Sequence, residues 1–229
     1  DRILLDRVSF SLDRGDKVGV IGVNGAGKST LLRLLAGAEE PDGGAIVRES
    51  NVRLEYLMQD PAFEASRTVL EQVLLGLSEN ARALAEYEAK SILSRLGVRA
   101  FEQKMGRLSG GERRRAALAA VLCRPCDVLI LDEPTSNIDT DSEQRLQQRL
   151  AAVSQGRTLI LVTHRLSMLR MVNKLAVMEN GRLRMFGPRD AILKRLRDNA
   201  AAARKPAPEK GQEAPGGAAA VKEGKDGRP

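Results

Sequence analysis

The sequence predicts an α/β fold in which a mainly parallel sheet is flanked by helices, with an antiparallel β subdomain and a small helical subdomain. Over residues 1–200, short β-rich runs alternate with helical patterns, which is typical of parallel strands joined by crossover helices. Two runs, 128–131 and 159–162, are apolar at every position. Strands of that kind are covered on both faces, so the sheet is expected to lie between two layers of helices.

The first expected element is a half-exposed antiparallel strand over 8–12, because Val8, Phe10 and Leu12 alternate with serines. The remaining expected strands are short β-rich runs over 17–21, 52–57, 127–131, 158–163, 174–178 and 182–186. The expected helices have helical patterns and cover 28–36, 69–77, 81–96, 110–122, 141–153 and 189–197.

Composition divides the 229 residues into one domain and a tail. Residues 1–200 are expected to form the domain, with its helical subdomain at about 65–125. Residues 201–229 contain mostly Ala, Gly, Pro, Lys and Glu, and they lack Leu, Ile, Phe and Tyr. Such a segment buries too little apolar surface to offset its ordering entropy, so a disordered tail is expected.

Charge and aromatic content narrow the class of partner. The formal net charge of +7 fits a polyanion such as a nucleotide, a nucleic acid or an anionic membrane surface. With no Trp, two Tyr and four Phe, a groove for single-stranded nucleic acid is a poor candidate. Two cysteines make no disulfide framework, and no apolar stretch reaches the ~18 residues that cross a bilayer. A cytoplasmic location is therefore expected.

A phosphate-binding loop is expected at residues 22–29, whose sequence fits the pattern GxxxxGK[ST]. It directly follows the apolar run 18–21 and directly precedes a helical run, which is the context that the pattern requires. The glycines let backbone N–H groups point at a phosphate, and the helix N-terminus adds its positive end. Lys28 would reach the β and γ phosphates, and the Ser29 hydroxyl would bind Mg²⁺. The sequence thus predicts a P-loop NTPase fold with these nucleotide-binding residues: Gly22, Asn24, Gly25, Ala26, Gly27, Lys28, Ser29 and Thr30.

Two adjacent acids, Asp132 and Glu133, end the apolar run 128–131. At a strand end beside the phosphate loop, Asp132 is expected to hold Mg²⁺ through water. Glu133 lies one residue further on, where it would orient or deprotonate the attacking water.

Further short segments complete the pattern. Leu108-Ser109-Gly110-Gly111-Glu112 lies one helix and one strand before the acidic pair, and Gln59 follows the expected strand 52–57. Asp139 follows the carboxylates, and His164 follows the strand 158–163. Together with the phosphate loop, this combination resembles the ABC (ATP-binding cassette) ATPase family over nearly all of residues 1–197.

The resemblance implies roles for these residues and a second cassette. It implies that Gln59 senses Mg²⁺ and the water, that His164 contacts the γ phosphate, and that Asp139 lies in a loop crossing to the partner cassette. It also implies that Ser109, Gly110 and Gly111 cap the ATP held by the other cassette of a head-to-tail dimer. The implied catalytic residues are Glu133, His164, Gln59 and Lys28, and the implied metal-binding residues are Ser29, Gln59 and Asp132.

The resemblance divides between two classes of ABC protein. Residues 22–134 resemble the soluble translation-factor class (ABC-F) through Asn24-Gly25-Ala26-Gly27 and the short segment between Gln59 and Ser109. Residues 135–197 resemble bacterial exporters through Ser136-Asn137-Ile138-Asp139, Thr163-His164-Arg165 and Phe186-Gly187-Pro188-Arg189-Asp190. A single cassette that begins without Met also suits a piece of a membrane-fused exporter, so we favour a nucleotide-binding domain that powers a membrane transporter. Its partners would then be transmembrane domains, at the inner face of the plasma membrane. The alternatives are an ABC-F ATPase on the ribosome and a nucleotide-gated module without hydrolysis.

Overall fold

The computed structural model describes residues 3–136 and 140–203, without the side chains of 140–142 and 201–203. Its centre is a six-stranded sheet in the order β2-β3-β4-β1-β5-β6, in which only β6 is antiparallel to its neighbour. The strands are β1 Lys17–Ile21, β2 Leu54–Leu57, β3 Val128–Asp132, β4 Thr158–Val162, β5 Lys174–Glu179 and β6 Arg182–Pro188. The predicted fold class is confirmed.

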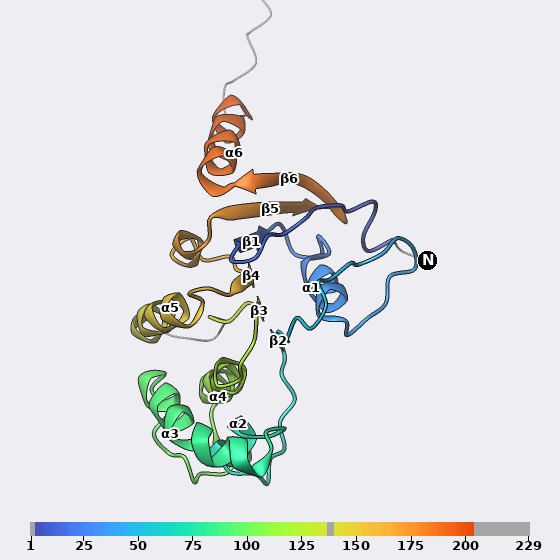
Figure 1. Cartoon of the computed structure of the whole chain (residues 1–229). Coiled ribbons are helices and arrows are strands. Elements are labelled where there is room, and N and C mark those ends of the chain that lie inside the picture. Colours follow the sequence, from blue (N-terminus) through green and yellow to red (C-terminus); the bar gives the residue numbers. More distant parts are fainter. Residues whose placement is uncertain (1–2, 137–139, 204–229) are drawn as a thin grey trace, which may run out of the picture.

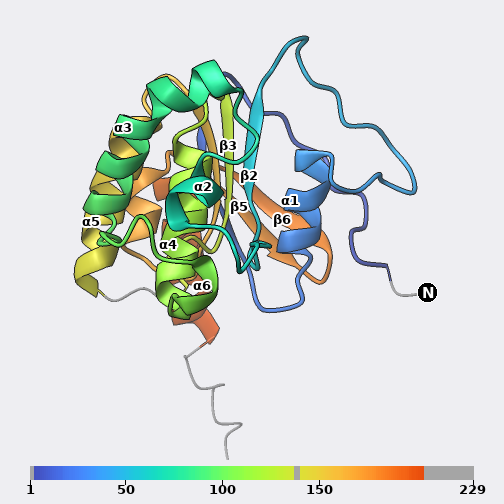
Figure 2. The ribbon, with the colours of Figure 1, turned by 90° about the horizontal axis from the view of Figure 1, so that it is seen from below.

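Helices cover both faces of this sheet, as the two all-apolar strands require. The helices are α1 Lys28–Ala36, α2 Val69–Val73, α3 Glu79–Arg95, α4 Gly110–Leu122, α5 Thr140–Val153 and α6 Arg189–Ala203, with 3₁₀ turns at Met105–Arg107 and Met168–Met171. Figure 1 and Figure 2 show α1 on one side of the sheet, and α3, α4 and α5 on the other.

The two faces of the sheet have separate hydrophobic cores. Side chains that alternate along a strand divide between them: Ile130 and Ile160 pack with Leu32 of α1, whereas Leu129 and Leu131 pack with the helices of the opposite face. Among those helices, α2, α3 and α4 contact one another and form a helical layer over β2. In the described chain, no helix has both the length and the apolar character needed to span a membrane.

The strand expected over 8–12 is not formed, although its pattern of burial is as expected. Val8, Phe10 and Leu12 are half-buried against the core on the α1 face, and the serines between them are exposed. Phe10 also contacts Phe186 of β6, with ring centroids 5.3 Å apart. Alternation reports one-sided burial, whereas a strand also needs a backbone partner. The antiparallel pairing in the described residues is that of β5 with β6, together with a single bridge between Thr68 and Lys104.

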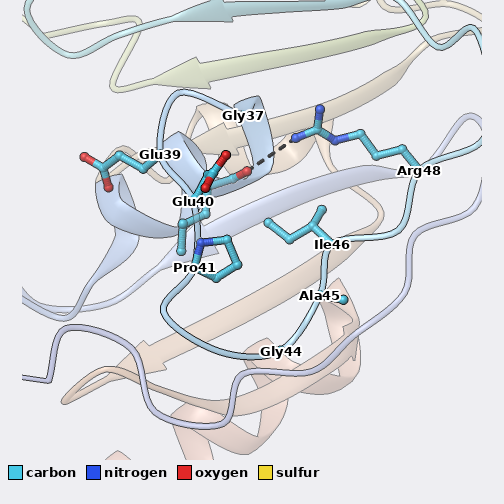
Figure 3. A pocket seen from close by; sticks show the side chains of 9 residues that line it. Gly37, Glu39, Glu40, Pro41, Gly44, Ala45, Ile46 and Arg48 are labelled. Atoms are coloured by element: carbon cyan, nitrogen blue, oxygen red, sulfur yellow. Dashed lines mark hydrogen bonds between the residues drawn. The ribbon is translucent and has the colours of Figure 1, made fainter.

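The C-terminal end of α1 forms a hollow of about 530 Å³ with the loop that follows it (Figure 3). Its lining residues are Leu34, Gly37, Glu39, Glu40, Pro41, Gly44, Ala45, Ile46 and Arg48. The Arg48 guanidinium donates to the carbonyl oxygens of Leu34 and Leu35, at 3.4 and 2.9 Å. The Leu34 carbonyl also accepts from the Gly37 N–H at 3.0 Å, so Arg48 adds a donor at the end of the helix, where carbonyls lack intrahelical partners. The hollow lies at the opposite end of α1 from Lys28 and is separate from the phosphate loop.

Candidate functional site

The carboxyl ends of five parallel strands meet at one edge of the sheet, and the expected site residues follow four of them. Gly22 follows β1, Gln59 lies just beyond β2, Asp132 ends β3 and His164 lies just beyond β4. The strand register places Asp132 beside Val162, and Val162 beside Val20. Segments that are far apart in the sequence therefore meet at this edge, where open α/β sheets bind their ligands.

The phosphate loop has two glycines that other residues would not replace easily. A side chain at Gly22 would place its Cβ 2.2 Å from the carbonyl oxygen of Met178. Gly27 has φ of 93°, and a Cβ there would lie 2.7 Å from the Leu4 carbonyl oxygen. Gly27 is also the N-cap of α1 and makes no side-chain cap. Because the first N–H groups of the helix receive no partner from its cap side chain, they suit an anion.

The Lys28 ammonium is buried at this loop, beside the acids that end β3. It donates to the carbonyl oxygens of Gly22 and Val23 at 2.8 and 2.9 Å. Burial lowers the pKa of Lys28, and the nearby Glu133 and Asp132 carboxylates oppose that change. The loop therefore holds a positive charge at the start of a helix, where phosphates would bind.

Asp132 is the clearest sign of a metal at this edge. Its side chain is 1% exposed, and neither carboxylate oxygen has a hydrogen-bond partner among the described residues. Burial raises the pKa of Asp132, and the adjacent Ser29 hydroxyl opposes that rise. A buried carboxylate without a hydrogen-bond partner is costly, and the nearby Lys28 and Arg114 cations do not fully offset that cost, because the net change in pKa is upward. Carboxylate and hydroxyl oxygens suit Mg²⁺, so Ser29 and Asp132 fit the predicted metal site.

Glu133 lies in a strained turn and contacts His164. Its φ is 48°, a left-handed conformation that non-glycine residues rarely adopt. Its backbone N–H donates to the Val162 carbonyl oxygen at 3.0 Å. The Glu133 carboxylate lies 3.0 Å from His164 Nε2, and both side chains reach solvent. The strained turn thus places a carboxylate against His164, just beyond the end of β4.

The segment 109–111 begins α4, on the face of the sheet that is covered by α3, α4 and α5 (Figure 2), and Asp139 lies outside the described residues. Ser109 is the N-cap of α4 and forms a capping box with Glu112, in which each side chain accepts from the other residue's backbone N–H. Ser109 and Gly110 are exposed, and α4 lies on the opposite face of the sheet from α1 (Figure 2). The Gln59 side chain is also exposed, while its backbone lies next to the end of β3.

Arg114 was not among the site residues expected from the sequence. It is buried in α4 behind the two acids, and it donates to the Asp132 and Glu133 carbonyl oxygens. A signal was present, because Arg114 shares its helix face with the buried residues Leu118 and Val121. An arginine at a core position needs several acceptors, and this one finds them at the site.

Comparison with known proteins decides the family. A family model described as ABC transporter matches residues 5–136. The chain belongs to this family of ABC ATPases. One relative is YfmR of Bacillus subtilis, which is described as an uncharacterized ABC transporter ATP-binding protein. The two sequences are 34% identical in an alignment that covers 80% of this chain and 35% of YfmR. The chain is 39% identical over 153 residues to the energy-dependent translational throttle protein EttA of Escherichia coli K12, covering 66% of this chain and 28% of EttA. The chain thus spans about a third or less of these two relatives.

Solved ABC cassettes have the same fold. The structure described as an ATP-binding subunit of an ABC transporter has a TM-score of 0.75 and 25% identity, covering 87% of this chain and 92% of that one. A dimeric cassette, MJ0796 bound to ADP and phosphate, has a TM-score of 0.71 and 22% identity, covering 81% and 90%. ABC ATPases bind ATP, and the phosphate loop and acidic pair of this chain lie within the residues that the family model matches.

Proposed function

We propose that this ABC cassette binds and hydrolyses Mg-ATP at the carboxyl edge of its sheet. The observation that carries the proposal is the buried, unpartnered Asp132 carboxylate beside the phosphate loop, with the Glu133–His164 contact one residue further on. The buried Asp132 carboxylate suits a cation that is bound to phosphate. The contact with His164 would hold Glu133 in place as a base. A module that only binds nucleotide needs no such base, so the contact favours hydrolysis.

Each residue of the site has a distinct part in the reaction. Ser29 and Asp132 would hold Mg²⁺, which neutralises charge on the phosphate oxygens when it is bound. Lys28 and the N–H groups of the loop would hold the β and γ phosphates. Glu133 would accept the proton of the attacking water, and His164 would hold the Glu133 carboxylate and contact the γ phosphate. Gln59, next to the end of β3, would contact the metal and the water.

The exposed Ser109–Gly111 segment supports a head-to-tail pair of cassettes. It begins α4, so a helix N-terminus and free space are available to a phosphate held by another cassette. Two cassettes related in this way would each close the other's ATP site. Asp139 would lie in the loop that crosses between them.

Light scattering tests this pairing in the Glu133→Gln variant, in which slow turnover would keep ATP in place. We expect twice the monomer mass with Mg-ATP and the monomer mass without nucleotide. Adding Gly110→Asp should abolish the dimer, because it sets a carboxylate against the partner's phosphates.

The Gly110→Asp substitution should leave the fold of the cassette intact, so that any loss of the dimer reports on the contact between cassettes. No heavy atom lies within 4 Å of a Cβ built at Gly110, and an acid at the first helical position favours the helix dipole. A monomer that is saturated with ATP would contradict the pairing, as would a dimer that Gly110→Asp leaves intact.

We propose that ATP hydrolysis by this cassette drives a membrane transporter. The cassette would act from the cytoplasmic side, through transmembrane partners. The exporter-like motifs in residues 135–197 support this candidate. The second candidate is an ABC-F protein that acts on the ribosome, and the 39% identity to EttA favours it. Fractionation of a cell lysate distinguishes the two candidates. The Glu133→Gln chain should sediment with membranes if it belongs to a transporter, and with ribosomes if it is an ABC-F protein.

A further inference from the structure

Arg114 lies where the helical layer meets the acidic end of β3. It belongs to α4, the helix that begins at Gly110, and only 5% of its surface is exposed. Burial lowers the pKa of Arg114, and the Asp132, Glu133 and Asp60 carboxylates oppose that change. A buried guanidinium needs hydrogen-bond acceptors on several sides.

The acceptors of Arg114 are backbone carbonyl oxygens of two different segments. Its Nη1 donates to Met58 at 2.6 Å and also to Gln59, just beyond β2. Its Nη2 donates to Asp132 and, at 3.0 Å, to Glu133. The planar guanidinium therefore joins α4 to the two segments that carry the expected water-contacting and general-base side chains.

The Glu133 carbonyl is part of the strained turn. Besides Arg114, it accepts from the Ser136 backbone N–H and from the Ser136 hydroxyl, each at 3.0 Å. A left-handed conformation at a non-glycine residue persists only where the surroundings hold it. Two of these three donors belong to Ser136, which is part of the same turn. The third donor, Arg114, belongs to α4 and therefore ties the turn to another element.

We propose that Arg114 is a positioning residue that holds the Glu133 turn and the Gln59 backbone in a fixed position relative to α4. It acts through backbone carbonyls and sets the direction of the Glu133 side chain relative to bound ATP. Because α4 begins at the Ser109 segment, Arg114 also links the segment expected to meet a second cassette with the general base. This inference rests on the proposed ATP hydrolysis.

The test compares three variants of the full chain, Arg114→Met, Arg114→Lys and Arg124→Met. Arg124 follows the far end of α4 and donates to the Leu75 carbonyl and to Glu55, so its loss removes similar bonds away from the site. We expect Arg114→Met to lower kcat about 10- to 100-fold, as a base misplaced by ~1 Å does, with the ATP KM within about twofold. Arg114→Lys should recover part of kcat, and Arg124→Met should leave kcat within about twofold.

Backbone amide hydrogen exchange without nucleotide gives a readout that does not depend on hydrolysis. Arg114→Met should speed exchange in 58–60 and 132–136 while leaving 22–29 unchanged, and Arg124→Met should affect neither site segment. If Arg114→Met does not fold, hydrogen exchange in the same segments is compared between Arg114→Lys and Arg124→Met, and that comparison tests the positioning role.

The inference is overturned if folded Arg114 variants keep both the wild-type kcat and the wild-type exchange. It is also overturned if kcat and ATP affinity fall together and Arg124→Met behaves in the same way, because Arg114 would then only stabilise the fold. A wild-type chain without hydrolysis would contradict the proposed function, and the exchange pattern would still test the positioning role.

Discussion

Replacing Glu133 with glutamine is expected to lower kcat for ATP hydrolysis by ~10²- to 10³-fold and to leave ATP binding within a few fold of the wild type. The amide keeps the size of the side chain but does not accept a proton from water at neutral pH. Binding is retained because the phosphate loop belongs to β1 and α1, and Lys28 donates to carbonyls within that loop. Phosphate release and equilibrium binding of a fluorescent ATP analogue measure the two effects separately.

The control for this change is Glu179→Gln. Glu179 ends β5 at the same edge of the sheet, and its carboxylate pairs with Arg184. The variant should therefore hydrolyse ATP at the wild-type rate. A Glu133→Gln chain with near wild-type kcat would remove Glu133 from the role of general base.

Replacing Asp132 with asparagine is expected to change activity and stability in opposite directions. Mg²⁺-dependent hydrolysis should fall by at least ~10²-fold, because a metal ligand and its charge are lost. Without Mg²⁺ and nucleotide, the variant should be the more stable protein, since it no longer buries an unpartnered charge. A gain of ~1 kcal/mol raises Tm by about 2 to 4 °C in a domain of this size.

The pH dependence of this gain follows from the raised pKa of Asp132. Above its folded pKa the wild-type carboxylate is ionised, and the cost of burying it is fully present. As pH falls through the folded pKa, the carboxyl becomes neutral and the cost disappears. The Tm difference between variant and wild type should thus shrink on acidification. A wild type that is equally stable or more stable at pH 8 without metal would contradict the view that Asp132 awaits a cation.

Local signals predicted the elements that carry the site. The bounds of β1, α1 and α4 are as expected, because glycines flank α1 and Ser109 with Glu112 starts α4. The residues Gly22, Gln59, Asp132 and His164 follow from strand ends, which parallel pairing must bring to one edge. The motif spacing therefore predicted which segments meet there.

Long-range pairing explains what the sequence did not predict. The pattern in 8–12 predicted one-sided burial correctly, but it contained no information about a backbone partner. The helix bounds differ for a local reason: α2 ends at Val73, earlier than the expected 77, and α3 begins at Glu79 instead of 81, because the Ser78 side chain caps it. The part played by Arg114 depends on carbonyls from residues 18 and more positions away, which no local pattern reveals.

The most direct test of the account is phosphate release from ATP by the purified wild-type chain, with Mg²⁺ and again with EDTA. A Lys28→Ala chain prepared in the same way reports any contaminating ATPase, because it lacks the ammonium that would hold the β and γ phosphates. We expect steady release by the wild type with Mg²⁺, and none above background with EDTA or with Lys28→Ala. Release that is the same in all three samples, or absent from a folded wild type that binds Mg-ATP, would contradict this expectation.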